Sequence, residues 1–398
     1  MKWKYRFGAV MGNALESYEI AVFAAISPYL SAELNRLGYE QATEMVWGIF
    51  ALRFLSRPIG GYIIGLYAEK VGKKSALILT SFITGLATLS MAFLPIELLG
   101  AYTPIAILII QLALSFSFAG EYPSLVTYLF KDSRLNERAK ISAMIVCSGL
   151  LGFAICLGMV FVLDKALSQE TMQTIGWRIP LFLGLINVII SFWFRAKLPE
   201  QPINSVKNKL NIKSVIAVIF IAIPGAVIFY MQSISSIIII SHLNLGDSKS
   251  LFIVVSTCIL ISLIIIIGWW TDKYSSPEKV FNVGVWGGVL LSIPLYYLLE
   301  ATNITFVFIA QFLLILFSSL ILSATSSVLF SGSLGNVVVL ALGNNIAQTC
   351  IGGLTPLTVN YLKSYGITYV GLFISLICLI YIMYGYLTKY HHVKQSIL

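Results

Sequence analysis

Five ionisable residues lie inside long apolar segments of this 398-residue chain: Glu16, Glu19, Arg53, Arg57 and Glu121. Glu16 and Glu19 are spaced i,i+3 and Arg53 and Arg57 are spaced i,i+4, so each pair shares one face of a helix. A carboxylate in surroundings of low dielectric constant either pairs with a cation or exchanges a proton near neutral pH. These residues therefore predict a buried ion-pair network or a proton-transfer site.

The composition identifies those surroundings as a lipid bilayer. Hydrophobic residues make up 58% of the chain and charged residues only 11%, against the ~25% charge of an ordinary soluble domain. A soluble enzyme is excluded. The net charge of +9 comes from basic residues dispersed between apolar runs, so we expect no nucleic-acid partner. The five cysteines are scattered within apolar runs and predict no metal site, and no cofactor is expected.

A membrane-spanning helix needs about 20 mostly apolar residues. On this criterion the sequence predicts an all-α polytopic membrane protein with twelve spanning helices, at residues 6–30, 45–67, 75–94, 104–130, 141–163, 178–198, 212–240, 250–272, 279–299, 304–330, 335–361 and 366–390. With this topology nineteen Lys and Arg residues fall on one side of the membrane and five on the other. Basic loops stay in the cytoplasm, which predicts that both termini are cytoplasmic.

The chain also contains an internal repeat. Residues 65–70 (GLYAEK) and 268–273 (GWWTDK) each place a carboxylate four residues after a glycine and a lysine directly after the carboxylate. Parallel repeats are a known transporter architecture. We therefore predict two six-helix bundles, at 1–196 and 214–398, joined by a polar cytoplasmic linker at 197–213.

Six short motifs together resemble the major facilitator superfamily, and within it the metabolite:proton symporter family. They are GNALESYE at 12–19, RPIGG at 57–61, GLYAEKVGKK at 65–74, FAGEY at 118–122, GWRIPL at 176–181 and GGLTPL at 352–357. The chain departs from the family pattern at Ser17, where Trp is usual, at Glu19, where Asp is common, and at Arg53, where the residue is often small and neutral.

The resemblance implies a secondary transporter of the bacterial inner membrane that takes up a small polar metabolite with a proton by alternating access. The family carries zwitterions such as proline and betaine and organic acids such as α-ketoglutarate, so the substrate stays open. Export, proton-independent transport and a sensor that has lost transport are alternatives. An enzyme ranks last, because no cluster of His, Cys or Asp lies inside the apolar segments. We expect a monomer whose partners are solute, protons and lipid.

The resemblance also implies a cytoplasmic gate, in which the loop carboxylate Glu69 docks at the start of the eleventh helix, near Gly335. Neighbouring basic residues, Lys73 and Arg138, would hold it in place. The remaining predicted gate residues are Gly65, Lys70, Gly72 and the second-half carboxylate Asp272.

The charged residues of the first half are predicted to share one layer of the membrane. At ~1.5 Å per residue they lie roughly 12–20 Å from the inner ends of their helices. We expect Glu16 to pair with Arg57 and Glu121 with Arg53. Three acids against two arginines leave one carboxylate unmatched, and Glu121 and Glu19 are the favoured proton carriers.

The second half has polar rather than charged residues at the corresponding depth. Tyr230, Gln232, Asn344, Asn345 and Gln348 are the candidate substrate-lining residues. Their alternative role is helix packing, since such side chains routinely form hydrogen bonds between membrane helices.

Overall fold

The structure, a computed structural model, describes residues 2–131, 133–201, 210–233, 235–236, 239–240, 243, 249–301 and 303–397. In these ranges the side chains of Glu16 and of residues 249–251 and 389–397 are outside the description. The described part of the chain contains 12 helical segments long and apolar enough to cross a membrane, which confirms the predicted fold class.

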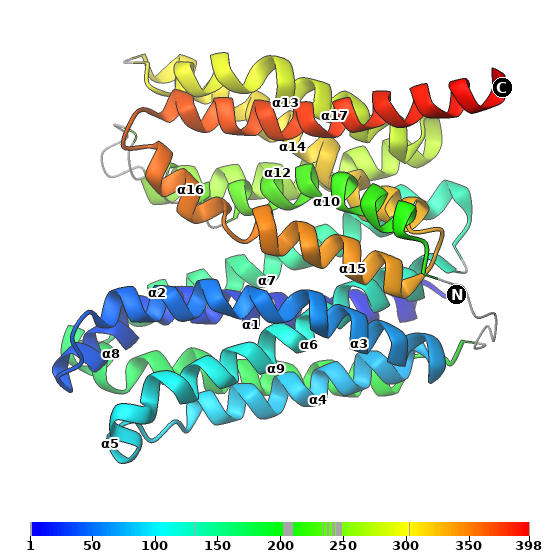
Figure 1. Ribbon diagram of the computed structural model, residues 1–398. Helices are drawn as coiled ribbons and strands as arrows, with labels where there is room; N and C mark the ends of the chain where they lie inside the picture. The colour runs from blue at the N-terminus through cyan, green and yellow to red at the C-terminus, as the bar shows by residue number, and fades with distance from the viewer. Residues whose placement is uncertain are drawn as a thin grey trace. The chain divides into compact units, whose positions relative to one another are not determined.

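The helices follow one another in the order shown in Figure 1. They are α1 (Trp3–Arg36), α2 (Ala42–Leu52), η1 (Arg53–Ser56), α3 (Arg57–Lys70), α4 (Lys73–Ala92), α5 (Ile96–Leu99), η2 (Gly100–Tyr102), α6 (Thr103–Lys131), η3 (Leu135–Glu137), α7 (Arg138–Ala166), α8 (Gln169–Thr174), η4 (Gly176–Arg178), α9 (Ile179–Ala196), α10 (Ile212–Gln232), α12 (Lys249–Tyr274), α13 (Pro277–Leu299), α14 (Ile304–Gly332), α15 (Val337–Ala347), η6 (Gln348–Gly352), α16 (Thr355–Leu362) and α17 (Ile367–Ile397). The predicted seventh span, 212–240, ends at Gln232 as a continuous helix, and part of its remainder lies outside the described residues.

The chain forms two compact units. Unit 1 is Met1–Asp132, Ser148–Leu210 and Asn336–Asn345, and unit 2 is Ser133–Cys147, Asn211–Gly335 and Ile346–Leu398. This division exchanges two short segments, Ser133–Cys147 and Asn336–Asn345, relative to the sequence halves. The predicted linker at 197–213 stays a prediction, because its residues 202–209 lie outside the description.

In unit 1, α4 packs against α6 and α9, while α1 packs against α2 and α9 (Figure 1). Close approach depends on glycines, as is usual between membrane helices. A Cβ at Gly60 would lie 2.5 Å from the Phe116 carbonyl oxygen, and one at Gly120 would overlap the side chain of Ile64. These contacts fix α3 against α6 and so position the charged residues of both helices.

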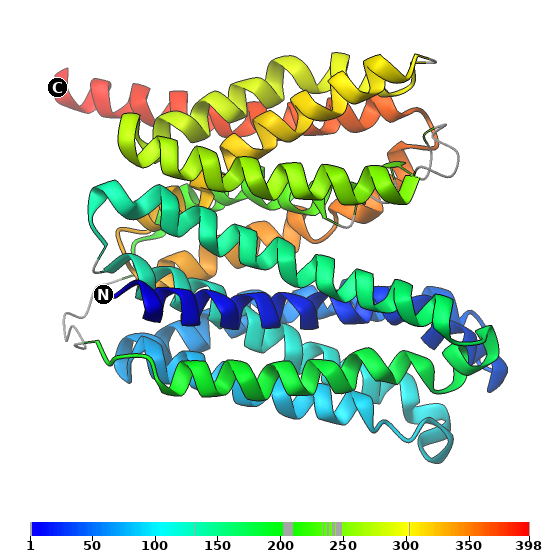
Figure 2. The ribbon, with the colours of Figure 1, turned by 180° about the vertical axis from the view of Figure 1, so that it is seen from behind.

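In unit 2, α14 packs against α10, α12 and α13, and α17 packs against α10 and α13; Figure 2 shows these helices from behind. Glycine again allows the contact, since a Cβ at Gly284 would lie 2.8 Å from Ile321 Cγ1 and one at Gly371 would lie 2.6 Å from the Ser292 carbonyl oxygen. Unit 2 therefore uses the same packing principle as unit 1.

Two of the spanning segments that the structure describes are interrupted near their middle. A 3₁₀ turn, η1, separates α2 from α3, and α3 then begins with Arg57 and Pro58. A π-helical turn, η6, separates α15 from α16, where Gly353 N–H donates to the Gln348 carbonyl over 2.7 Å. Interruptions of this kind often occur at functional sites and hinges.

Candidate functional site

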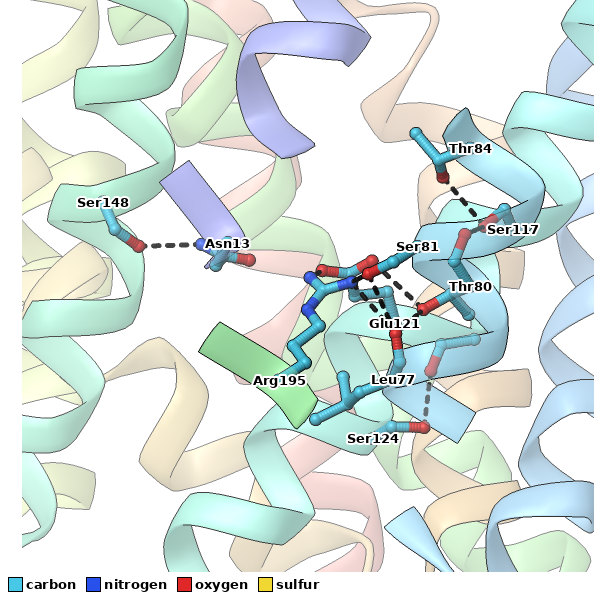
Figure 3. Close-up of polar contacts among 11 residues, drawn as sticks. Asn13, Leu77, Thr80, Ser81, Thr84, Ser117, Glu121, Ser124, Ser148 and Arg195 are labelled. Atoms are coloured by element: carbon cyan, nitrogen blue, oxygen red, sulfur yellow. Dashed lines mark hydrogen bonds and ion pairs between the residues drawn. The ribbon is translucent and has the colours of Figure 1, made fainter. Parts of the chain in front are cut away.

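The centre of unit 1 contains a buried ion pair between Glu121 of α6 and Arg195 of α9. The two side chains are only 1% and 2% exposed and point toward each other in Figure 3. Thr80 of α4 donates a hydrogen bond of 3.3 Å to Glu121 Oε2. Arg195 also donates to the Leu77 carbonyl oxygen, over 3.1 Å, and to Ser81 Oγ. Three helices thus converge on one carboxylate and one guanidinium.

Hydroxyl groups extend this network (Figure 3). Ser117 donates to the Thr80 carbonyl oxygen over 2.7 Å and lies 3.0 Å from Thr84 Oγ1. Beside the pair lies a cavity of ≈ 10 Å³, lined by Leu15, Ser81, Thr84, Glu121, Val188, Ser191 and Arg195. That volume is room for about one water molecule. The surroundings of Glu121 therefore contain groups that can relay a proton.

Arg195 was missing from the predicted charged layer, and the predicted pairing of Glu121 with Arg53 is wrong. Arg195 is one of the nineteen basic residues counted on the cytoplasmic side, although it lies within the predicted span 178–198. Arg195 also adds a third arginine to the two that were counted against three acids. That one of these carboxylates lacks a cation stays a prediction, because the Glu16 side chain is outside the described residues. Gly12 of the first motif lets Arg195 reach this position, since a Cβ there would lie 3.1 Å from Arg195 Nε.

Arg53 lies in an aromatic environment. Its Nη1 donates to Gln111 Oε1 over 3.1 Å, and its guanidinium carbon is 4.2 Å from the centre of the Phe50 ring and 5.3 Å from that of Phe54. Arg53 is 2% exposed. Cation–π contacts gain strength where water is excluded, so the rings contribute to holding this charge inside the bilayer.

Arg57 is also buried, at 7% exposure, with its guanidinium carbon 4.7 Å from the Phe54 ring centre. Among the described side chains no carboxylate lies within ion-pair distance of Arg57. The predicted Glu16–Arg57 pair stays a prediction, because the Glu16 side chain is outside the described residues.

Glu19 is the second candidate proton carrier. It is 3% exposed, and Thr88 of α4 donates to its Oε2 over 2.9 Å. Its carboxylate lies directly against Gly184 of α9, where an added Cβ would overlap it. Glu19 and Glu121 thus both contact α4 and α9 with α4 hydroxyls as donors, at different levels of unit 1.

A buried carboxylate outside the predicted layer, Glu33, lies near the other end of α1. It accepts a hydrogen bond from Trp177 Nε1 and lies 3.6 Å from Arg178 Nη1, and it is 6% exposed. The GWRIPL motif supplied the signal for its two partners, whereas Glu33 itself belongs to none of the motifs.

The predicted gate carboxylates both lie at helix N-termini. In unit 1, Glu69 Oε1 accepts from Val338 N–H of α15 over 3.5 Å, and Gly65 lets the helices approach, since its Cβ would lie 3.3 Å from Val338 Cα. In unit 2, Asp272 accepts from Ala139 N–H and Lys140 N–H of α7, over 2.8 and 2.9 Å. Each placement suits a negative charge.

The other predicted gate residues have varied surroundings. Gly72 has φ +120°, a left-handed conformation that favours glycine, and separates α3 from α4. Lys73 donates to the Thr127 carbonyl oxygen over 3.2 Å, and Lys70 is exposed. Arg138 lies in unit 2, 5.5 Å from the Phe330 ring centre.

The candidate substrate-lining residues divide between the units. Asn345, in unit 1, donates to the carbonyl oxygens of Ala119 and Ala341, over 2.7 and 2.8 Å, and Asn344 beside it is buried. In unit 2, Gln232 donates to Ser318 Oγ over 2.9 Å, Tyr230 is buried, and Gln348 begins the π turn. Asn345 and Gln232 therefore have helix-packing bonds of the kind expected under the alternative.

Comparison with known proteins identifies the family of this chain. Residues 6–214 match the family model described as "Sugar (and other) transporter". A Staphylococcus haemolyticus protein named "Putative proline/betaine transporter" is 28% identical over 382 residues, covering 89% of this chain and 80% of that protein. The ectoine/proline transporter ProP of Corynebacterium glutamicum is 23% identical over 396 residues, covering 89% of this chain and 77% of its own.

Solved structures share the fold. The proton:xylose symporter XylE, bound to 6-bromo-6-deoxy-D-glucose, aligns with a TM-score of 0.75 at 13% identity, covering 96% of this chain and 94% of that one. The human organic anion transporter MFSD10 aligns with a TM-score of 0.65 at 12% identity, covering 96% and 99%. This multi-pass membrane protein is a secondary transporter of small solutes rather than an enzyme; it has the major facilitator fold and belongs to the sugar (and other) transporter family.

Proposed function

We propose that this transporter takes up a small zwitterionic solute, of the proline or betaine type, together with a proton. The names of the relatives support the solute class. The observation that supports proton coupling best is the buried Glu121–Arg195 pair, with hydroxyl donors and a cavity the size of one water molecule beside it. A carboxylate in such a site can change its protonation state within the membrane.

The chemistry of the pair links a proton to helix positions. While Glu121 is ionised, it neutralises Arg195 and holds α6 against α9. When Glu121 accepts a proton, Arg195 loses this ionised partner and keeps the Leu77 carbonyl oxygen and Ser81 as neutral acceptors. The attraction between the two helices then weakens. An interaction that differs between two states shifts their populations by its own free energy, which is what coupling to alternating access requires.

The orientation belongs to the same proposal. Nineteen of the Lys and Arg residues fall on the side of the N-terminus and five on the other, so both termini are cytoplasmic under the positive-inside rule. The protein acts as a monomer in the bacterial plasma membrane, and no partner other than solute, protons and lipid is needed.

The proposal is tested by uptake of radiolabelled proline and betaine into proteoliposomes, with and without an imposed pH gradient. Accumulation of solute driven by an inward proton gradient supports the proposal. A panel of unlabelled amino acids, betaines and α-ketoglutarate, added as competitors, identifies the solute. A uniporter would show uptake indifferent to the gradient, an exporter would transport in the opposite direction, and a sensor would show no uptake. An organic acid as the sole competitor would contradict the zwitterion assignment.

We further propose that Glu69 and Asp272 are latches of a cytoplasmic gate, each docked at a helix N-terminus in one of the two states. Asp272 is the stronger latch, because it accepts two amide hydrogen bonds of ordinary length, whereas Glu69 accepts one of 3.5 Å. A charge at a helix N-terminus contributes about 0.3–1 kcal/mol when exposed and up to ~2 kcal/mol when partly buried. Each latch thus shifts the ratio of states by a few-fold to ~30-fold.

Replacing Glu69 by Gln should therefore favour the inward-open state, and replacing Asp272 by Asn should favour it more. The measurement is the rate of thiol labelling at a reporter cysteine on the outer half of α1, in a background without the five native cysteines. Labelling should slow in both variants. Lys74→Gln, which changes a charge in the first turn of α4, is the matched control and should label at the parental rate. Unchanged or faster labelling in the Asp272 variant would contradict the latch.

A further inference from the structure

Arg57 is a buried cation without an anion among the described side chains. It is 7% exposed, and a ring contact with Phe54 is the contact that the structure shows for its guanidinium. The buried carboxylates of the same bundle whose side chains are described have other neighbours. Glu121 contacts Arg195 and Thr80, Glu19 contacts Thr88, and Glu33 contacts Trp177 and Arg178. A guanidinium in this environment is costly unless an anion joins it.

The position of Arg57 suits a ligand. It lies near the middle of the span Ala42–Lys70, directly after the 3₁₀ interruption η1. The opposite face of α3 presents Ile59, Tyr62 and Ile63, which are 61%, 43% and 50% exposed and suit contact with lipid. Arg57 instead lies on the face of Gly61, whose Cβ would be 2.6 Å from the Asn345 amide nitrogen. The guanidinium is therefore directed into the protein at the depth where solutes of such transporters bind.

We propose that Arg57 binds the carboxylate group of the transported solute. The planar guanidinium matches a carboxylate with two parallel hydrogen bonds. The solute carboxylate supplies the negative charge that the described side chains do not supply to Arg57. The Phe54 ring contacts the guanidinium as well. This inference rests on the proposed function, because it assigns to one residue the recognition of the acidic half of a zwitterion.

The test compares each solute with its amide, which keeps the size and the amino group but lacks the negative charge. Binding of proline and of prolinamide to purified protein is measured for the wild type, Arg57→Gln and Arg57→Lys. The wild type should prefer proline, and Arg57→Gln should lose about ten- to a hundredfold in affinity for proline while its affinity for prolinamide stays unchanged. Arg57→Lys, which keeps the charge without the planar fork, should recover part of the preference.

An unchanged preference in folded Arg57→Gln overturns the inference. The competing role is a structural pair with Glu16, and it has a separate signature: Arg57→Gln would lose folded protein, and Glu16→Gln combined with Arg57→Gln would restore both folding and the preference for proline. If the wild type binds only carboxylates that are not zwitterions, the proposed solute class is contradicted. Loss of the preference for such a carboxylate over its amide in Arg57→Gln would still support the role of Arg57. A wild type that transports only solutes without a carboxylate overturns both.

Discussion

Replacing Glu121 by Gln should abolish solute accumulation driven by a pH gradient while leaving exchange of solute across the membrane. Glutamine is a fixed neutral side chain and resembles the protonated carboxylic acid, so the protein can still change conformation with solute bound but cannot gain or release the proton. Arg195 keeps the Leu77 carbonyl oxygen and Ser81 as acceptors, which favours a folded variant. The measurement is gradient-driven uptake and counterflow in the same proteoliposomes, normalised to the amount of protein.

Two matched variants make this result specific. Glu19→Gln replaces the other candidate carrier, which also has an α4 hydroxyl as donor. Glu33→Gln replaces a buried carboxylate outside the charged layer, bound to Trp177 and near Arg178, and should lower stability without uncoupling transport. If Glu121→Gln accumulates solute normally and Glu19→Gln does not, then Glu19 is the carrier.

Replacing Arg195 by Ala should cause a large loss of folded protein, because it leaves the Glu121 carboxylate buried without its cation. Removing one partner of a buried ion pair typically costs 3–5 kcal/mol. Combining Glu121→Gln with Arg195→Ala replaces the stranded carboxylate by a neutral amide, to which Thr80 can still donate, so the double variant should recover much of the loss. Thermal unfolding followed by size-exclusion chromatography in detergent gives the amounts of folded protein.

The double variant provides the internal control for this prediction. Recovery shows that the loss in Arg195→Ala comes from the stranded charge rather than from lost packing. If the double variant is no more stable than Arg195→Ala, the ion pair does not hold α6 and α9 together. The recovered double variant should remain uncoupled, since it has no carboxylate at position 121.

The number of helices could be predicted from the number of long apolar runs in the sequence. A backbone inside lipid must satisfy its own hydrogen bonds, so each long apolar run must be a helix. The interruptions were harder to foresee. The motif that contains Arg57 and Pro58 marks the end of η1, whereas the π turn at Gln348 was visible only as the glycines and the proline that follow it.

The ion pairing could not be predicted from the sequence, because it depends on the rotation and neighbours of each helix. Arg195 lies near the end of an apolar run, where long basic side chains commonly extend to the membrane surface. It was therefore counted among the basic residues of the cytoplasmic side. In the structure it is directed inward, beside Gly12 and Glu121. The docking of Glu69 at a helix N-terminus could be predicted because the resemblance to the superfamily implied it. The docking of Asp272 on α7 follows the same pattern in the second copy.

Entry of the solute together with a proton that Glu121 carries is tested most directly by measuring the pH inside proteoliposomes. A pH-sensitive dye is trapped in the lumen, and proline or betaine is added outside without an imposed gradient, with valinomycin and potassium to clamp the membrane potential. The account predicts solute-dependent acidification of the lumen with the wild type and none with Glu121→Gln, although that variant still exchanges solute. Solute uptake by the wild type without acidification, or equal acidification with Glu121→Gln, would contradict it.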